Sequence, residues 1–547
     1  MRWVGNPSLA GAGQGPGQLI DQILERRGLA SGPEREAFLQ PKLSNLSAPE
    51  EIPGMAAATA LLQRHLHAKS PMVIYSDYDV DGITSASVFR LFVEALGGGP
   101  VRHFIPDRKK EGYGLTAKGL ERCLEGGAKP KLLVVLDCGT NSKAEVEKAK
   151  AAGIDVLIVD HHQIGEVAPG DALVNPQLGS THHHLCTAGL VFKLCHAYLK
   201  SHGGREQFDL KTVLDLVALA TVADLVPLEK DNRIFVREGL RRLVQTAHPG
   251  LKRLLEVSGG GSRTPTTFTL GFQLGPRINA GGRVGEATAG LELILSKDPT
   301  ETARLARELD LQNRKRQELE AMVLEEAEAE IGESPSGLGL VAASDRWHPG
   351  VVGIVAARLV RKFHRPSFVI ALEEGGGKGS GRGLPGVSLM DALRACSPCL
   401  KGFGGHDGAA GIVIEADRVA DFRKILGAWL EKSVSPQLFE RSLSIEMCLQ
   451  PEHLTAEMAR AVGELAPFGK GNPEPVFQLE GVTMTAQPKV FAERHLKFRA
   501  QAGERKFEVV GFDFARRPPD RPTFDLAGSW EWDEYTDAPR WRMIDWR

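Results

Sequence analysis

The hydrophobic pattern from about residue 72 onward alternates between short apolar runs and longer amphipathic stretches. Short apolar runs predict strands, and amphipathic stretches predict helices. In order, the pattern predicts a strand at 72–76, a helix at 83–96, a strand at 101–105, a helix at 116–125, a strand at 132–136, a helix at 142–152 and a strand at 154–159. Because these strands are apolar throughout, we expect a mostly parallel sheet with helices on both faces, which is an α/β fold.

From about 230 to 335 the pattern is helical. An apolar stripe at helical spacing crosses a highly charged stretch and consists of Leu305, Leu309, Leu319, Val323, Ala327 and Ile331. This stripe favours a helical connector over coiled-coil self-association. A second α/β region follows, with strands near 338–342, 367–372 and 410–414, helices near 350–363 and 418–431, and Gly-rich loops at 375–383 and 402–408.

From about 440 the apolar segments become short and alternating, as at 476–479, 496–499 and 507–510, which predicts a small β barrel. Between Pro488 and Arg521 the chain has nine Lys or Arg and five Asp or Glu. Five aromatic residues lie among them, namely Phe491, Phe498, Phe507, Phe512 and Phe514. A protein that binds single-stranded nucleic acid needs cations along the phosphate backbone and aromatic rings that stack on the bases. The alternative is a Phe-filled barrel core with a solvated basic face.

A chain of 547 residues is too long for one core, so several domains are expected. The patterns predict an N-terminal arm at 1–50, a first α/β domain at 51–265, a helical connector at 266–333, a second α/β domain at 334–436 and a β barrel at 437–547. The arm is rich in Gly and Pro around one short amphipathic segment.

Composition narrows the class of protein. Apolar residues make up 42% of the chain and charged residues 25%, as in ordinary globular proteins, and we find neither a membrane-length apolar run nor a signal peptide. The seven cysteines are sparse and odd in number, which argues against a disulfide framework, so we expect a cytoplasmic protein without a membrane partner. A net charge of -2 means that nucleic acid would need a local basic groove.

Metal-ligand side chains follow the predicted strands at the points where the strands end. They are Asp77, Asp79 and Asp81 after the first strand, Asp137 after 132–136, and Asp160, His161 and His162 after 154–159. Asp224 ends an apolar helical run at 213–223. Ligands of parallel sheets bind beyond the carboxyl ends of the strands, so we expect these side chains to meet at one edge of the sheet.

Three carboxylates within the six residues Asp77–Gly82 repel one another, and we therefore expect a cation beside them. The stretch resembles the start of an EF-hand loop, but Val88 stands where that loop needs a Glu, and a strand precedes it. An acidic N-cap cluster on the 83–96 helix is the alternative. Carboxylates with one or two imidazoles suit Mn²⁺ or Mg²⁺, and pairs of such ions serve phosphoester hydrolysis. Adjacent His161 and His162 point to opposite faces, so we expect them to differ in role.

Other motifs are weaker. The segment His182–His184 with Cys186 could bind a soft metal, although a solvated loop is the favoured interpretation. Cys396 and Cys399 form a single pair without a second pair at zinc spacing, which favours a structural role. The stretches 379–382 and 404–406 combine glycines with Ser, Arg and His, which suits either a phosphate contact or a turn.

The stretches Asp77–Gly82, Val135–Gly139, Asp160–His162 and Thr221–Asp224, in this order, resemble the DHH phosphoesterase superfamily. Further segments are similar to the RecJ family of bacterial single-strand exonucleases within it, namely 105–108, 111–115, 276–283, 347–353 and 467–475. The similarity runs from about residue 50 to the C-terminus. It implies a DHH catalytic domain, a DHH-associated domain and a C-terminal OB-fold.

The resemblance implies a role for each candidate site residue. Asp77, Asp79 and Asp81 would supply the first metal motif, Asp137 would bridge two Mn²⁺ or Mg²⁺ ions, and His161 and Asp224 would ligate the second ion. Catalytic roles would fall on Asp79, Asp137 and His162, and His162 would face the scissile phosphate. Contacts to the DNA backbone or its 5′ end would come from Arg108, Arg277, Asn279, Arg283, Ser380, Arg382 and His406.

The resemblance also implies an activity. Members of the RecJ family degrade single-stranded DNA from the 5′ end to 5′-mononucleotides in DNA repair and recombination, and single-stranded-DNA-binding protein and a RecQ-type helicase are implied as partners. A narrow cleft between the two α/β domains would select single strands. One alternative is a DHH phosphodiesterase for short oligoribonucleotides or cyclic dinucleotides, which the C-terminal barrel disfavours. Another is an inactive replication scaffold, which the complete set of ligands disfavours.

Overall fold

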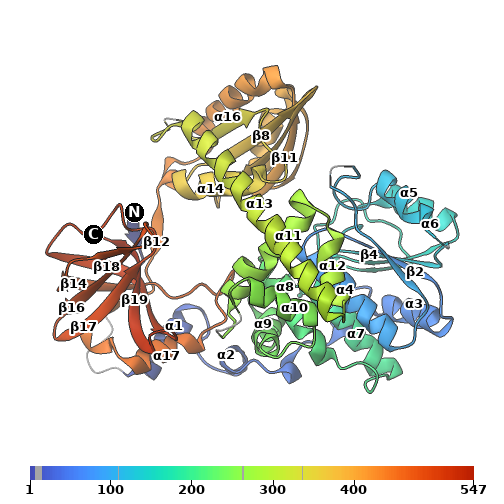
Figure 1. The fold of residues 1–547 in the computed structure, drawn as a ribbon, viewed down its shortest axis with the longest axis horizontal. Helices are drawn as coiled ribbons and strands as arrows, with labels where there is room; N and C mark the ends of the chain where they lie inside the picture. Colours follow the sequence, from blue (N-terminus) through green and yellow to red (C-terminus); the bar gives the residue numbers. More distant parts are fainter. Residues whose placement is uncertain (6–14, 109, 128, 261–263, 336) are drawn as a thin grey trace. The chain divides into compact units, whose positions relative to one another are not determined.

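The computed structural model describes residues 1–5, 15–108, 110–127, 129–260, 264–335 and 337–547 (Figure 1). The chain divides into two compact units, each described by itself below. One unit consists of Met1–Val4 and Leu311–Ser444, and the other of Gly5–Asp310 and Ile445–Arg547. The predicted arm at 1–50 includes residues 6–14, which lie outside the described residues. Among the described residues of the arm are two helices, α1 (Pro16–Arg26) and α2 (Pro33–Leu39).

A five-stranded parallel sheet forms the centre of the first α/β domain. Its order is β3 (Val101–Phe104), β2 (Met72–Ser76), β4 (Leu132–Leu136), β5 (Asp155–Val159) and β6 (Ala172–Val174). The predicted parallel sheet is confirmed, because apolar runs of this length bury both faces of each strand. The sequence pattern missed β6, whose three residues are too few to show a period.

Helices cover both faces of this sheet (Figure 1). One face packs against α3 (Met55–His67), α4 (Val80–Ala95), α7 (Thr187–His202) and α8 (Leu214–Ala223). The other packs against α5 (Ala117–Glu125) and α6 (Lys143–Ala151). Successive strand residues alternate between the two cores, so that Ile74 lies in the first and Tyr75 in the second.

Helices continue the first core beyond the sheet. They are α9 (Lys230–Leu243), α10 (Pro249–Val257), a π-helical segment at Thr269–Leu274, α11 (Gly275–Val284), α12 (Thr288–Leu295) and α13 (Pro299–Ile331). Along the predicted stripe of α13, Leu305 and Leu309 pack in this core, whereas Val323 and Ala327 pack against the second α/β domain. The two units accordingly divide α13 between Asp310 and Leu311.

The second α/β domain contains a mixed five-stranded sheet. Its order is β10 (Leu400–His406), β11 (Ala409–Ile414), β9 (Gly376–Arg382), β8 (Ser367–Glu373) and β7 (Leu340–Ser344), and within it β7 and β8 are parallel. Helices α14 (Val352–Phe363), α15 (Leu389–Ala395) and α16 (Val419–Ser433) pack with this sheet, and the short strand β12 (Ser442–Ser444) pairs with β1 (Arg2–Val4) in the same unit.

The prediction of two Gly-rich loops in this domain was wrong, because β9 and β10 occupy most of both stretches. In β9 the glycines make room for large neighbours on the adjacent strands. A Cβ at Gly381 would lie 2.3 Å from the Phe368 ring, and one at Gly379 would lie 2.7 Å from Ile412. Propensity alone predicts loops from such glycines, because it contains no information about the residues on the paired strands.

The C-terminal strands close into the predicted barrel. They are β13 (Met447–Leu449), β14 (Phe477–Met484), β15 (Lys489–Phe491), β16 (His495–Ala502), β17 (Arg505–Gly511), β18 (Thr523–Asp533) and β19 (Ala538–Trp546). Pairing of β14 with β16 closes a ring of five of these strands, β14, β18, β19, β17 and β16, while β13 pairs with β14 and β15 with β16 outside the ring. Helices α1 and α17 (Ala456–Glu464) pack against the core of the barrel. The interleaved phenylalanines divide, because Phe498 and Phe507 are buried whereas Phe491 and Phe512 are 39% and 45% exposed.

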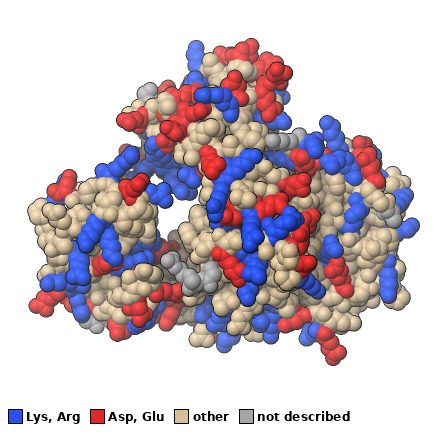
Figure 2. Space-filling view, viewed as in Figure 1, with Lys and Arg blue, Asp and Glu red and all other residues tan. Residues whose placement is uncertain are grey.

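The surface carries both signs of charge. Figure 2 shows acidic and basic side chains interspersed over the face drawn, in keeping with the net charge of -2. Across the described residues, no helix has the length and apolar character that crossing a bilayer would require.

A buried guanidinium of α9 joins the arm to the segment that follows α17. Arg233 is 2% exposed and lies 3.7 Å from the centre of the Phe38 ring. It donates hydrogen bonds to the carbonyl oxygens of Phe38 at 2.7 Å, Leu465 at 3.0 Å and Ala466 at 2.9 Å. Two parts of the chain that are far apart in sequence therefore depend on one side chain of α9 for their carbonyl hydrogen bonds.

Replacing this side chain tests its structural role. We expect Arg233→Met to destabilise the protein by about 2–4 kcal/mol, because it leaves several buried carbonyl oxygens without donors. The measurement is the urea midpoint of the full chain. Arg242→Met removes an exposed arginine of the same helix and should leave the midpoint unchanged; equal midpoints for the two variants would contradict the role assigned to Arg233.

Candidate metal centre

The acidic stretch after β2 forms the start of α4. Asp79 is the N-cap of this helix, and its Oδ1 accepts hydrogen bonds from the backbone N–H groups of Asp81 at 3.0 Å and Gly82 at 3.1 Å. The helix therefore begins at Val80, and the predicted start at 83 was wrong. Asp and Gly disfavour a helix interior, but an acid suits the first turn, where backbone N–H groups lack partners.

The end of β2 and the first turn of α4 approach each other closely. A Cβ at Gly82 would lie 2.3 Å from the carbonyl oxygen of Asp77, so only glycine fits there. On the next strand, Asp137 has a φ of 64°, a left-handed conformation that non-glycine residues rarely adopt. Two backbone constraints thus occur at the edge where the predicted ligands emerge, as is common at functional sites.

The N-terminus of α7 holds two of the carboxylates. The two oxygens of Asp81 accept hydrogen bonds from the backbone N–H groups of Thr187 at 2.7 Å and Ala188 at 2.8 Å. The Thr187 hydroxyl donates to Asp137 Oδ1 at 2.8 Å. The sequence pattern did not identify Thr187, whose only local signal is its place at the start of an apolar helix.

The structure brings together the six predicted metal ligands. Three groups have potential ligand atoms within 4.8 Å of one another, namely Asp77, Asp79 and Asp137; Asp81, His161 and Asp224; and Asp137, His161 and His162. His161 Nε2 lies 3.8 Å from Asp81, 3.6 Å from Asp137 and 3.6 Å from Asp224. Asp137 and His161 each belong to two groups, which makes them the centre of the cluster.

Burial and mutual repulsion disfavour the charged form of these acids. Burial, and then the charge of Asp79, raise the pKa of Asp77 to about 8. Burial, followed by the charges of Asp81 and Asp79, raises the pKa of Asp224 to about 8. The pKa of Asp137 is raised well above its ordinary value by burial and by four neighbouring carboxylates. The cluster is therefore strained in the absence of a compensating positive charge.

The residues present fit divalent metal ions. Asp77 Oδ1 is buried and has no hydrogen-bond partner among the described residues, so one acceptor is left without a donor. Carboxylate oxygens with one imidazole are ligands that Mn²⁺ and Mg²⁺ accept, whereas zinc and copper sites favour thiolates or several imidazoles. Six ligands from four segments suffice for two ions.

The second histidine has different partners. His162 Nδ1 lies 2.7 Å from Asp160 Oδ1, and His162 Nε2 lies 2.9 Å from the Tyr113 hydroxyl. Burial lowers the pKa of His162, but the hydrogen bond and charge of Asp160 outweigh it and raise the pKa to about 9. The imidazole is thus protonated at neutral pH and held beside the acidic cluster. Tyr113 lies within the 111–115 segment, but its sequence position alone predicted no role for it.

Four of the predicted substrate contacts lie in the same unit as the acidic cluster. Arg277 pairs with Asp310 at 2.9 Å and donates to the Gln273 carbonyl at 2.7 Å. The side-chain oxygen of Asn279 accepts from the Val80 N–H at 3.0 Å, so Asn279 supports the start of α4. Arg108 lies over the Tyr78 ring at 5.7 Å, and the positive charges of Arg108 and Arg283 act on the same tyrosine.

The other three predicted contacts lie in the unit that contains the second sheet. Arg382 donates to the Ser380 hydroxyl at 2.9 Å, across neighbouring positions on β9. His406 ends β10, is exposed, and accepts from the Gly408 N–H at 3.1 Å through Nδ1. These polar groups share one sheet, with β11 between β9 and β10.

The weaker metal motifs gain no support from their surroundings. His182 pairs with Glu51 at 3.0 Å, Cys186 is buried, and none of the ligand groups found among the described residues includes either of them. Cys396 and Cys399 are free thiols buried in the core of the second α/β domain. Their structural interpretation is in keeping with this burial.

Comparison with family models covers most of the chain. Residues 71–221 match the DHH family, N-terminal domain; residues 337–432 match the DHHA1 domain; and residues 445–544 match the RecJ OB domain. These matches fall on the first α/β domain, the second α/β domain and the barrel.

Curated relatives are similar over nearly the whole chain. The single-stranded-DNA-specific exonuclease RecJ of Bacillus subtilis (strain 168) is 35% identical over 503 residues, which is 90% of this chain and 63% of that relative. The RecJ of Dickeya dadantii (strain 3937) is 36% identical over 508 residues, and this chain covers 86% of it. The RecJ of Escherichia coli (strain K12) is 33% identical over 504 residues, with the same 86% coverage.

Solved structures share the fold. RecJ from Thermus thermophilus in complex with Mn²⁺ matches with a TM-score of 0.82 and 28% identity, over 100% of this chain and 79% of that chain. Exonuclease RecJ bound to manganese matches with a TM-score of 0.62 and 32% identity, over 71% of this chain and 96% of that chain.

Removing one carboxylate tests whether the acidic cluster is built for metal. We expect Asp137→Asn to stabilise the metal-free protein by about 1–2 kcal/mol, because it relieves repulsion at the centre of the cluster. Saturating Mn²⁺ should raise the melting temperature of the wild type by mass action and leave that of the variant almost unchanged. Thermal unfolding after EDTA treatment, with and without MnCl₂, measures both effects.

Glu147→Gln is the matched control, since Glu147 is an exposed acid on α6 in the same domain. It should behave like the wild type in both states. A Mn²⁺-induced shift that survives in Asp137→Asn would contradict a metal centre that includes Asp137.

Proposed function

The chain belongs to the RecJ family of single-stranded-DNA-specific exonucleases, and from this premise we propose that it is a metal-dependent exonuclease that hydrolyses single-stranded DNA from the 5′ end to 5′-mononucleotides. It uses two Mn²⁺ or Mg²⁺ ions and acts in DNA repair and recombination in the cytoplasm. A single-stranded-DNA-binding protein and a RecQ-type helicase are proposed as partners that supply its substrate.

The observation that carries this proposal is the convergence of acids from separate segments. Carboxylates that follow β2 and β4, an imidazole that follows β5 and the carboxylate that follows α8 form overlapping groups of three, within each of which the potential ligand atoms lie within 4.8 Å of one another. Such a cluster costs folding free energy, so it is expected where chemistry requires it.

The ligands divide into two metal positions. Asp77 and Asp79 would hold one ion, and Asp81, His161 and Asp224 would hold another. Asp137, which shares one group with Asp77 and Asp79 and another with His161, would contribute to both. When bound, a pair of divalent ions supplies a water nucleophile at neutral pH and positive charge for the phosphoryl transition state. The Thr187 hydroxyl orients the shared carboxylate through its hydrogen bond to Asp137 Oδ1.

His162 acts on the substrate phosphate. Its ring is held by Asp160 on Nδ1 and is protonated at neutral pH, since its pKa is raised to about 9. A protonated imidazole donates a charge-assisted hydrogen bond to a phosphate oxygen and balances the charge that develops there. The Tyr113 hydroxyl lies 2.9 Å from Nε2, and Tyr113 is 55% exposed, so a phosphate that binds Nε2 would take the place of this hydroxyl.

Each unit offers arginines and polar groups to the DNA backbone. Arg108 and Arg283, which lie near Tyr78 beside the acidic cluster, bind backbone phosphates. Arg277 on α11 is a third cation for the same backbone. Ser380, Arg382 and His406 offer hydroxyl, guanidinium and imidazole donors from one sheet, a set that suits the 5′ phosphate. Contacts confined to phosphates position the strand without reading its sequence.

The barrel binds the strand away from the acidic cluster. Phe491 and Phe512 flank the His495 ring, with centroid distances of 5.1 and 5.2 Å, and Val490 beside them is 55% exposed. Lys489 and Arg494 are exposed in the same region. Exposed rings beside cations are suited to stacking on the bases of a single strand.

End-labelled DNA tests the activity and its direction. We expect a 5′-labelled single strand to release labelled mononucleotide from the earliest times, and a 3′-labelled strand to shorten progressively, in the presence of Mn²⁺. Duplex and RNA of the same sequence should be cut far more slowly. Asp137→Asn should lose at least about a hundredfold in rate, since several kcal/mol of charge stabilisation depend on the metals. Early release of the 3′ label would refute the direction.

The aromatic surface of the barrel has its own test. We expect Phe491→Ala/Phe512→Ala to weaken binding of a long single strand by about tenfold or more, because each stacked base contributes about 1–3 kcal/mol. Cleavage of an oligonucleotide too short to reach the barrel should not change. Tyr535→Ala removes another exposed ring of the barrel and serves as control. Equal losses on long and short substrates would show that the effect is not one of strand binding.

A further inference from the structure

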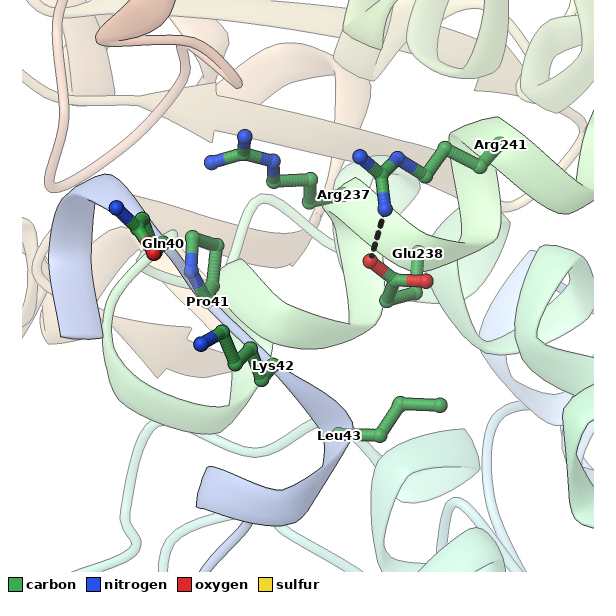
Figure 3. Close-up of a pocket in the computed structure, with 7 residues that line it drawn as sticks. All are labelled: Gln40, Pro41, Lys42, Leu43, Arg237, Glu238 and Arg241. Carbon is green, nitrogen blue, oxygen red and sulfur yellow. Dashed lines mark hydrogen bonds and ion pairs between the residues drawn. The ribbon is translucent and has the colours of Figure 1, made fainter.

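A pocket of about 410 Å³ lies between the end of the N-terminal arm and α9 (Figure 3). It is lined by Gln40, Pro41, Lys42, Leu43, Arg237, Glu238 and Arg241. None of these residues belongs to the acidic cluster, to the predicted DNA contacts or to the barrel surface described above. The pocket therefore has no part in the proposed reaction.

Its lining is positively charged. The lining contains three cationic side chains, Lys42, Arg237 and Arg241, and one carboxylate, Glu238, which pairs with Arg241 at 2.9 Å (Figure 3). Arg237 uses Nη1 to donate to the Leu39 carbonyl at 2.7 Å, so the arm and the guanidinium hold each other in place. Lys42 is exposed, and its ammonium group makes no hydrogen bond or ion pair within the described part of the chain.

The surroundings add positive charge. Arg233, Arg237 and Arg241 are spaced four residues apart and so share one face of α9. The buried Arg233 guanidinium bonds to carbonyl oxygens rather than to a carboxylate. Burial, and then the positive charges of Arg237 and Arg27, lower the pKa of Arg233 to about 9. An anion in the pocket would reduce this repulsion among cations.

We propose that this pocket is a second phosphate-binding site. Arginine and lysine are the side chains that bind phosphate oxygens, Gln40 offers an amide donor, and Pro41 and Leu43 form an apolar wall. The volume lies within the range of small-ligand sites. The phosphate belongs either to a free mononucleotide or to the backbone of a single strand. The choice of these two sources rests on the proposed function, whereas the phosphate site itself rests on the residues that line the pocket.

The test uses a double variant and a matched control in metal-free buffer. Lys42→Gln/Arg241→Gln removes two cations of the lining and keeps Arg237, which holds the arm. Arg242→Gln removes the neighbouring exposed arginine, which does not line the pocket. Both substitutions of the double variant are at exposed positions, so unchanged melting temperatures are expected and confirm folding.

Calorimetric titration with thymidine 5′-monophosphate is the first measurement, with thymidine as the phosphate-free probe. If the source is a nucleotide, the monophosphate binds to the wild type and to Arg242→Gln, thymidine does not, and the double variant binds at least about tenfold more weakly.

The salt dependence of oligothymidylate binding is the second measurement. If the source is a DNA backbone, the slope of log affinity against log salt is shallower in the double variant by about 0.7 for each phosphate that the variant no longer neutralises. Either result supports the site and identifies its source. Identical titrations and identical slopes for the double variant and Arg242→Gln would overturn the proposal.

The two proposals fail separately. Loss of the proposed function would appear as an inactive wild type in the end-labelled DNA assay. Failure of the phosphate-site proposal would appear only in the metal-free binding measurements. Cleavage of a short oligonucleotide should proceed at the same rate in the double variant and in the wild type.

Discussion

Repulsion among buried carboxylates at one sheet edge is the constraint on which the rest of the structure depends. Asp77 and Asp137 are buried, Asp224 is partly buried beside them, and the raised pKa values of all three express the cost of placing these acids together. The scaffold offsets part of it with helix N-termini, since Asp79 caps α4 and Asp81 accepts from the first N–H groups of α7. The remaining negative charge is what gives the site its affinity for divalent cations.

Positive charge close to the cluster offsets only part of this repulsion, since His162 and Arg108 favour the charged form of Asp77 but its pKa is still raised. His162 carries its proton because Asp160 accepts from it, and Arg277 is held by Asp310. On the barrel, exposed rings accompany exposed cations, whereas Phe498 and Phe507 fill the core. A chain with a net charge of -2 thus presents local basic surfaces without becoming a polycation.

Much of the fold was predictable because the strands are apolar runs with helices between them. Each strand of the first sheet that exceeds three residues was predicted, and β6 was missed because three residues show no period. The predicted start of α4 was three residues late. Asp79 caps the helix and accepts from the N–H groups of Asp81 and Gly82, so these two residues belong to its first turn although Asp and Gly usually disfavour a helix. The sequence pattern predicts loops where β9 and β10 lie. The glycines of β9 are needed because Phe368 and Ile412 on neighbouring strands leave no room for a Cβ, and a local pattern contains no information about those neighbours.

The sequence by itself determined the α/β class, the barrel, and the residue types that follow each strand, since side-chain period and strand-end position are local properties. Only the tertiary structure decided that Thr187 orients Asp137, that Tyr113 meets His162, and that Arg277 is engaged by Asp310. It alone brought Lys42 of the arm and Arg241 of α9 to the lining of one pocket. The physical reason is that hydrogen bonds and charge interactions act over a few ångströms between atoms whose residues lie tens to hundreds of positions apart, and packing sets those distances.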